Sequence, residues 1–381
     1  MPLAGNPSVL VVSNGHGEDA VGAALAAHLA SSAEIVAYPL VGHGETYRDI
    51  RLLDPRKRFP SGGFILRAGW RRLFTDLRQG AFRHWRAQQH TLSTQVRAHR
   101  VVIAIGDVYC LWMAGRAGTR TVFVATAKSE YNEPHRALER SLIRRFAEQV
   151  FVRDALTAKV LAAQGIPARH VGNPLMDTIQ SDGPALPDAA GVPTVTLLPG
   201  SRTDAYLNVV QLLRLAARVS LQISVRWLCV LAPSLEVAQV QAVGRADGWT
   251  ADERSLRSGS VEIVLTRAFG EALNAADVVV GLAGTANEQA AGLGKPVVAF
   301  PGPGSQFTRR FLALQQRLLG EAVVGTGTWQ DASSAVVRLL HDPQERQRRG
   351  QIGRARMGSP GAIAAIAGEI QNWLGSAPSG V

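Results

Sequence analysis

The sequence predicts an α/β protein whose two domains each contain a doubly wound parallel sheet. Short runs of β-branched residues alternate with helical stretches along most of the chain. These runs are too apolar for a strand with one face in water, which is typical of parallel strands covered by helices on both faces. A chain of 381 residues also exceeds one ordinary hydrophobic core, so two domains are expected.

The first domain is expected over residues 1–178. Apolar runs predict its strands at 8–13, 34–39, 101–105, 121–125 and 149–152. Apolar residues at helical spacing predict helices at 19–31, 68–98, 134–147 and 154–164, the second of them broken near Gly80.

A polar stretch with proline and glycine at 179–192 predicts a linker, after which the alternation restarts over a second domain, 193–358. Its strands are expected at 194–198, 225–231, 261–264, 277–280 and 296–300. Helices follow at 329–340, 343–356 and 360–374, and the last, within 359–381, is expected to return towards the first domain. Doubly wound sheets bind ligands outside the carboxyl ends of their strands, so we expect a cleft between the two domains.

Cysteine usage and hydropathy exclude several classes of protein. Cys110 and Cys229 lie far apart in apolar surroundings, which argues against a structural disulfide and favours a reducing cytoplasm. Residues 1–12 lack the regions of a signal peptide, and no apolar run reaches the ~18–20 residues that cross a bilayer. The histidines lack metal-ligand spacing, and the first glycine turn is not a dinucleotide fingerprint, so we expect no metal and no cofactor.

Most of the net charge of +11 comes from residues 51–100, where twelve Lys and Arg residues oppose two acids. Apolar and aromatic residues interleave with these arginines, as in helices that lie on an anionic membrane surface. We therefore expect a membrane-facing surface formed by Trp70, Arg71, Arg72, Phe74, Phe82 and Trp85. A helix whose apolar face belongs to the core is the first alternative. A nucleic-acid surface is the second, but no nucleic-acid-binding motif accompanies the arginines, and no nucleic-acid partner is expected.

One turn of the second domain predicts a phosphate site. Gly200-Ser201-Arg202 joins a buried strand to a helix, and such a turn presents free N–H groups and the positive end of the helix dipole to an anion. The Arg202 guanidinium can bind two phosphate oxygens. An ordinary strand-to-helix turn with a surface arginine has the same pattern.

The stretch 276–320 contains a stronger signal. Gly284-Thr285-Ala286 again joins a strand to a helix, and the glycine loop 301–306 precedes the next helix. Two consecutive units of this kind place two helix N-termini at one edge of a sheet, which suits a nucleotide diphosphate and leaves polar side chains for ribose. Simple turns of the sheet are the alternative.

Four segments, in this order, resemble lipid-A-disaccharide synthases and related GT-B glycosyltransferases. They are SNGHGED (13–19), AIGDVYC (104–110), HVGNPLMD (170–177) with LLPGSR (197–202), and GTANEQAAGLGKP (284–296). The resemblance spans nearly the whole chain. It implies two Rossmann-like domains, a UDP-activated amino sugar as donor, a lipid-linked acceptor, no required metal, and a cytoplasmic enzyme associated peripherally with the inner face of the cell membrane.

The sequence departs from these synthases at several positions. Asp107 matches the first acid of their G-I-D-A-P-D-F sequence, whereas Tyr109 and Cys110 stand where the second acid is expected. The turn that contains His16 resembles the G-G-H turn of the N-acetylglucosaminyltransferase of peptidoglycan synthesis. The position of Gln306, after a glycine loop, also resembles that enzyme. We interpret the chain as a divergent branch whose substrates need not be lipid A precursors.

The resemblance implies an inverting transferase, in which a base takes the proton of the acceptor hydroxyl while UDP leaves. His16, whose type titrates near neutrality, and Asp107 are the catalytic candidates. The nucleotide sugar is expected on Gly200, Ser201, Arg202, Gly284, Thr285, Ala286, Glu288, Gln289 and Gln306. The acceptor side is expected at Asn14, Gly15, Gly17, Glu18, Asp19, Glu130 and Asn173. Helix capping by Glu18 and Asp19 and a solvated loop at Glu130 are the structural alternatives.

Two other functions remain open from the sequence. A UDP-N-acetylglucosamine 2-epimerase uses the same two-domain architecture, although its internal acids are not obvious here and the basic aromatic stretch would have no purpose. A non-catalytic relative that binds nucleotide or lipid is the other, because the second acid is missing.

Overall fold

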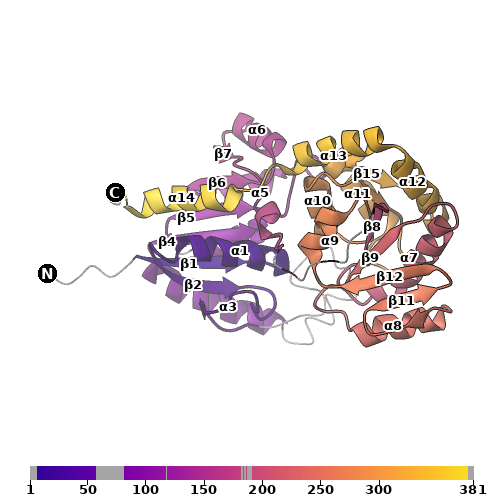
Figure 1. Cartoon of the computed structure of the whole chain (residues 1–381). Helices are drawn as coiled ribbons and strands as arrows, with labels where there is room; N and C mark the ends of the chain where they lie inside the picture. The colour runs from indigo at the N-terminus through magenta and orange to yellow at the C-terminus, as the bar shows by residue number, and fades with distance from the viewer. Residues whose placement is uncertain are drawn as a thin grey trace. The chain divides into compact units, whose positions relative to one another are not determined.

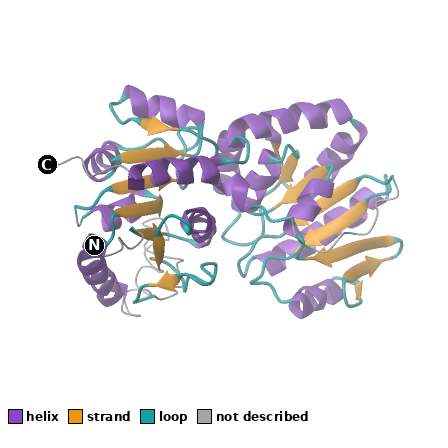
Figure 2. Ribbon diagram, turned by 60° about the vertical axis from the view of Figure 1, so that its left-hand side comes forward, coloured by secondary structure: helices purple, strands orange, loops and turns teal. Residues whose placement is uncertain are grey.

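The computed structural model describes residues 7–56, 81–116, 118–181, 183, 186 and 191–375. The chain divides into two compact units, one of residues 1–178 with 360–381 and one of residues 179–359. Each unit is an open sheet with helices on both faces (Figures 1 and 2). The predicted α/β class, with two parallel-sheet domains, is confirmed.

The sheet of the first unit contains parallel strands in the order β3-β2-β1-β4-β5-β6-β7. Its strands are β1 (Ser8–Ser13), β2 (Glu34–Pro39), β3 (Arg51–Leu52), β4 (Val101–Gly106), β5 (Thr121–Ala125), β6 (Gln149–Val152) and β7 (Ala168–Arg169). Its helices are α1 (His16–Leu29), α3 (Ala81–Gln95), η1 (Val96–Ala98), α4 (Val108–Gly115), α5 (Ala137–Phe146), α6 (Ala155–Ala163), η2 (Pro174–Thr178) and α14 (Ala362–Gly375).

Strand β1 shows why this sheet is covered on both sides. Its residues 9–12 are fully buried, and alternate side chains point to opposite faces. Val9 and Val11 join a core cluster with residues of α1 and α14, whereas Leu10 and Val12 join a second cluster with residues of α3 and α4. The continuous apolar run is therefore the signature of a central parallel strand.

Helix α14 completes the first unit although it follows the second one in sequence. It lies beside α1 (Figure 1), and its apolar side chains enter the same core cluster. The Asp177 carboxylate accepts hydrogen bonds from the backbone N–H of Gly361 and, at 2.7 Å, of Ile363. The Arg120 guanidinium lies 3.9 Å from the centre of the Trp373 ring. A capped first turn and a stacked last turn thus hold this helix against the sheet.

The sheet of the second unit has the strand order β10-β11-β12-β9-β8-β13-β14-β15. The pairs β10–β11 and β11–β12 are antiparallel, and the other pairs are parallel. Its strands are β8 (Thr194–Leu198), β9 (Arg226–Val230), β10 (Thr250–Ala251), β11 (Ser255–Ser258), β12 (Val261–Thr266), β13 (Val278–Gly281), β14 (Val297–Ala299) and β15 (Val323–Gly325). Its helices are α7 (Ala205–Ser220), α8 (Val237–Ala246), α9 (Phe269–Ala275), α10 (Thr285–Gly292), α11 (Arg309–Leu319), η3 (Gly320–Ala322), α12 (Trp329–His341) and α13 (Pro343–Met357).

In each sheet the strand order reverses between two parallel strands that lie side by side. In the first unit the chain leaves β1 towards β2 and later returns to place β4 on the other side of β1. In the second unit, β9 and β13 lie on opposite sides of β8. The connections on the two sides of such a point lead away from each other, which leaves a crevice outside the carboxyl ends of the two strands. The strand order therefore marks β1/β4 and β8/β13 as binding positions.

Candidate active site

The reversal point of the first unit brings together two of the predicted site segments. Ser13 pairs with Ile105, so the turns that follow β1 and β4 begin side by side. The Asn14 amide donates a hydrogen bond of 3.0 Å to the Asp107 carboxylate across this point. Asp107 is also the N-cap of α4 and accepts the N–H of Cys110 at 3.0 Å. Its carboxylate is thus fixed by two donors to the same oxygen, Oδ1.

Glu18 reaches across the same point from the first turn of α1. Its Cγ would lie 3.3 Å from a Cβ on Gly106, and its Oε2 would lie 2.6 Å from a Cβ on Gly15. Thr126, which follows β5, donates a hydrogen bond of 3.4 Å to Glu18 Oε1. The carboxyl group therefore occupies the space that two glycines, both with positive φ, leave open above β4.

The environment of these acids favours their protonated forms. Burial raises the pKa of Glu18 from its ordinary value of 4.5 to about 7, and the charge of Asp107 adds to this effect. Burial also raises the pKa of Asp107, although the hydrogen bonds from Cys110 and Asn14 oppose the increase. Perturbed carboxyl groups at the end of a parallel sheet are typical of a functional site.

Asp19 has a different position from Glu18. Its carboxylate is 1% exposed and accepts a hydrogen bond of 2.6 Å from the Ser13 hydroxyl, which in turn accepts one of 2.8 Å from Tyr47. Burial raises the pKa of Asp19 to about 7. The N-cap of α1 is Gly15, which offers no side-chain capping bond, and Glu18 and Asp19 lie in the first turn of the helix.

His16, the other catalytic candidate, is the exposed first residue of α1. Its Cε1 would lie 3.6 Å from a Cβ on Gly42, so the ring is next to the second Gly-His-Gly-Glu segment. Gly17, in the same turn, lies close to Leu175, whose Cδ2 would be 3.7 Å from a Cβ there. Within the described residues, the partner of Asp107 in this turn is Asn14 and not His16.

Two other residues expected on the acceptor side have internal partners. Glu130 Oε1 accepts the backbone N–H of His135 at 2.8 Å and lies 2.7 Å from the Nδ1 of the same histidine. Both side chains are buried, at 8% and 1% exposure, so this is not a solvated loop position. Asn173 is fully buried, and its Oδ1 accepts the N–H of Leu175 at 3.1 Å at the start of η2. Both residues therefore shape the loops around the site.

The reversal point of the second unit lies between the two turns predicted to bind phosphate. Leu198 pairs with Gly281, and a Cβ on Gly200 would lie 3.1 Å from the carbonyl oxygen of Leu282. The turns after β8 and β13 are therefore in direct backbone proximity. Such close turns at two helix starts form a site for an anionic group.

The loop 301–308 contacts the turn after β8 through Gln306. The Arg202 guanidinium donates a hydrogen bond of 2.5 Å to Gln306 Oε1, although the two residues lie 104 positions apart in the sequence. Asp204, at the start of α7, accepts the backbone N–H of Gln306 at 2.9 Å. Sequence reasoning missed Asp204, although its position two residues after Arg202 was a signal. It fixes the loop, while Arg202 remains exposed.

Helix α10 starts without a side-chain cap, at Gly284. Gln315 donates a hydrogen bond of 3.0 Å to the Gly284 carbonyl oxygen, and Asn287 donates one of 2.9 Å to Gln315. The buried Asn287 and Gln315 side chains thus fix the turn between β13 and α10 from its interior side. Glu288 is half-buried and Gln289 is 7% exposed, so Glu288 is the more accessible of the two residues expected near ribose.

The basic segment is only partly described. Trp70, Arg71, Arg72 and Phe74 lie outside the described residues, as does the side chain of Phe82. The Trp85 ring is half-buried: it stacks on Trp112 at 6.3 Å between centroids and packs against the core of the first unit. Its contacts agree with the alternative of a core-facing helix, and the membrane-facing role stays a prediction.

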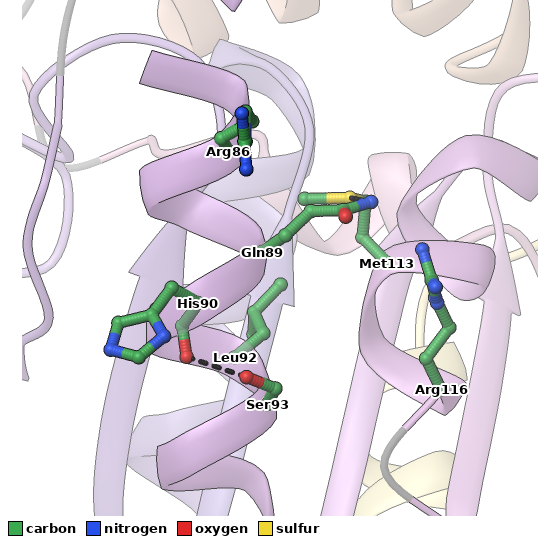
Figure 3. Close-up of a pocket in the computed structure, with 7 residues that line it drawn as sticks. All are labelled: Arg86, Gln89, His90, Leu92, Ser93, Met113 and Arg116. Carbon is green, nitrogen blue, oxygen red and sulfur yellow. Dashed lines mark hydrogen bonds between the residues drawn. The ribbon is translucent and has the colours of Figure 1, made fainter. Parts of the chain in front are cut away.

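Helices α3 and α4 enclose a pocket of about 400 Å³ (Figure 3). Gln89 points across it from α3 and donates a hydrogen bond of 3.7 Å to the Met113 sulfur. The lining residues are Arg86, Gln89, His90, Leu92, Ser93, Met113 and Arg116. The exposed arginines give this side of the first unit a cationic rim.

Within the described residues, no helix has the length and apolar character needed to span a membrane. In the same part of the chain, no three His, Cys, Asp or Glu side chains lie where they could hold a metal ion.

Comparison of the sequence with protein-family models and with curated proteins gives no match. Solved structures, however, match the whole chain. The calicheamicin glycosyltransferase CalG4 shares 15% identity, with 98% of this chain and 100% of that chain covered and a TM-score of 0.64. UDP-GlcNAc 2-epimerase from Neisseria meningitidis, bound to UDP-GlcNAc, shares 14% identity. The match covers 96% of this chain and 100% of that chain, with a TM-score of 0.57. MurG from Acinetobacter baumannii shares 15% identity, with 96% of this chain and 99% of that chain covered and a TM-score of 0.55.

These similarities identify the architecture. Coverage of almost the whole length of enzymes with two α/β domains shows that this chain has the GT-B fold. The resemblance to GT-B glycosyltransferases is thus confirmed for the fold. The narrower resemblance to lipid-A-disaccharide synthases stays a prediction about function.

Proposed function

We propose that the protein is an inverting glycosyltransferase that moves a sugar of the N-acyl-glucosamine type from a UDP donor to a lipid-linked acceptor, as in lipid-A-disaccharide synthases. The observation that supports this best is the reversal point of the second unit. Two glycine turns meet there, and Arg202 and Gln306 converge on the same edge from distant parts of the sequence. In this proposal the diphosphate binds these turns, and Glu288, the more accessible of the two residues expected near ribose, binds the ribose hydroxyl groups.

The first unit supplies the acceptor side. Its reversal point contains Asn14, Glu18 and Asp107, which can hold a hydroxyl group and take its proton. His16 stands at the exposed start of α1 beside this group. The reaction needs no metal in this proposal, because the arginine and the helix N-termini stabilise the leaving diphosphate.

We also propose that the enzyme works at the cytoplasmic face of an anionic membrane. The exposed arginines of α3, Arg83 and Arg86, and the exposed Arg116 after α4 form a cationic side of the first unit. Such a side is attracted by anionic lipids. Flotation with vesicles should recover the protein with phosphatidylglycerol vesicles and not with phosphatidylcholine vesicles. Equal recovery with both would contradict the proposal.

Epimerisation of UDP-N-acetylglucosamine is the second candidate, because an epimerase with UDP-GlcNAc bound has the same fold over the whole chain. Incubation with UDP-N-acetylglucosamine and membrane lipid separates the candidates. A glycolipid together with free UDP supports the transferase, and an isomerised sugar nucleotide supports the epimerase. Binding without turnover supports a non-catalytic role.

The nucleotide site has its own test. Arg202→Ala should weaken UDP binding about 10-fold to 100-fold, since hydrogen bonds to charged groups contribute about 1.5–3 kcal/mol. Arg218→Ala, which changes an exposed arginine in the last turn of α7, at the far end of that helix from Arg202, is the matched control and should bind UDP as the wild type does. Equal affinities in titration calorimetry would remove Arg202 from the site.

A further inference from the structure

Glu18 is the acid at the centre of the first unit's reversal point. Its carboxyl group lies over the end of β4, against Gly15 on one side and Thr126 on the other, and so connects the turns after three adjacent strands. The side chain is partly buried, which leaves it open to a ligand at this edge. No other acid of this unit has the same combination of a central position, a fixed side chain and access within the described residues.

The neighbouring acids are committed to other contacts. Asp107 accepts two hydrogen bonds on one oxygen and caps α4. Asp19 is 1% exposed and bound to Ser13. Glu18, in contrast, receives from Thr126 a long hydrogen bond of 3.4 Å. Hydrogen bonding to the backbone N–H of Glu18 itself also lowers the pKa of this carboxyl group. The side chain is thus held in place, while its contact with another side chain is long and weak.

The charges around Glu18 suit a proton acceptor near neutral pH. Asp107, on the N-terminus of α4, opposes its ionisation, whereas Arg153, after β6, favours it. Burial is the largest effect and raises the pKa of Glu18 to about 7. The titratable groups that face it are Asp19 on its own helix, Tyr47 of the following loop, Asp107 and Cys110 at α4, and Arg153.

We propose that the Glu18 carboxylate, and not His16, takes the proton of the acceptor hydroxyl in the transfer reaction. This inference rests on the proposed function. The acceptor oxygen forms a bond to the anomeric carbon, and its proton moves to Glu18. The bond from the anomeric carbon to the diphosphate oxygen breaks, and its electron pair leaves with UDP. Asp107 and Asn14 then act as positioning residues that orient the hydroxyl.

The kinetic test compares Glu18→Gln with His16→Ala in the full-length protein, using UDP-N-acetylglucosamine and membrane lipid and measuring UDP release. Glu18→Gln should lower kcat by about 100-fold to 10,000-fold, the range that general-base catalysis contributes, with the Kd for UDP unchanged. In the wild type, kcat/KM should rise with pH through about 7, and this limb should be absent in the residual activity of Glu18→Gln. Glu34→Gln, an exposed acid at the other edge of the same sheet, should retain wild-type rates.

Three results would overturn the inference: near-wild-type rates in Glu18→Gln, an unchanged acid limb in that variant, or a loss confined to His16→Ala. A second measurement needs no substrate. In protein labelled with ¹³C at glutamate carboxyl groups, one NMR signal should titrate near pH 7 and be missing from folded Glu18→Gln. The absence of such a signal refutes Glu18 as the base. Wild-type protein that neither binds UDP nor turns over UDP-sugar refutes the proposed function instead.

Discussion

Replacing Asp19 with asparagine should stabilise the first unit, and more so as the pH rises. Asp19 is almost inaccessible and lies among apolar side chains of β1 and α1, with the Ser13 hydroxyl as its hydrogen-bond donor. Burial raises its pKa from 3.8 to about 7, and the charge of Glu18 adds to this. Asparagine has the same shape and keeps an oxygen for the Ser13 hydroxyl.

The sign follows from the direction of this pKa shift. The native state binds the Asp19 proton more tightly than the unfolded state does, so stability falls as the pH rises from about 4 through about 7. A pKa raised from 3.8 to about 7 corresponds to about 4 kcal/mol at pH 8 and to about 2 kcal/mol at pH 5. Asparagine does not ionise and avoids this cost at both values.

Calorimetric unfolding of the full chain at pH 5 and pH 8 measures the effect. The gain in Tm of Asp19→Asn should be larger at pH 8, at about 2–4 °C for each kcal/mol. Glu45→Gln, an exposed acid of the same unit, should leave the pH dependence unchanged. An equal gain at both pH values would show that Asp19 is ionised in the native protein, and the reasoning from burial would be refuted.

Two further predictions concern packing. Gly353→Ala should destabilise the second unit by about 1–3 kcal/mol, because the new Cβ would lie 2.2 Å from the carbonyl oxygen of Ala291 and would push α13 away from α10. Its control, Gly368→Ala in α14, meets no atom within 4 Å and should stabilise by about 0.5–1 kcal/mol; denaturant titrations that rank the pair the other way would contradict this. Asp177→Ala removes the cap of α14 and should cost about 1 kcal/mol. Hydrogen exchange should then increase in α14 before it increases in β4, and uniform protection would show that the cap is dispensable.

The sequence allowed the central strands to be predicted, but not the edges of the sheets. Strands β1, β4 and β5 are apolar apart from Ser or Thr at their ends, and β8 adds two buried threonines to three apolar residues. Parallel strands with helices on both faces favour such β-branched and apolar side chains. Strands β3, β7 and β10 have two residues each and carry no periodic signal. The antiparallel pair β10–β11 was missed because β10 has two residues and the four residues of β11, SLRS, include one apolar side chain.

The residues of the candidate site were predictable from their types and positions, but their hydrogen-bond partners were less so. The turns after β1 and β4 were recognised as candidates, but their contact depends on the strand order, which no local pattern contains. Arg202 and Gln306 were named independently, and their hydrogen bond comes from the adjacency of strands far apart in sequence. The stacking of Trp85 on Trp112 was not predictable, because a tryptophan beside arginines has the same spacing on a membrane surface as over a core.

Each of the two reversal points contains a glycine with positive φ, but the charged side chains beside that glycine differ. In the first unit, the space above a glycine, Gly106, is filled by an acid of the same chain, Glu18, which is left half ionised near neutral pH. In the second unit, a Cβ on Gly200 would face the backbone oxygen of Leu282, and the neighbouring charges are the exposed cation Arg202 and Asp204, which is bound to the N–H of Gln306. The first point thus carries carboxyl groups whose protonated forms burial favours, whereas the second carries a guanidinium group, which attracts an anion such as a diphosphate. In the proposed function, the first point therefore holds the uncharged hydroxyl group of the acceptor, and the second point holds the diphosphate of the donor.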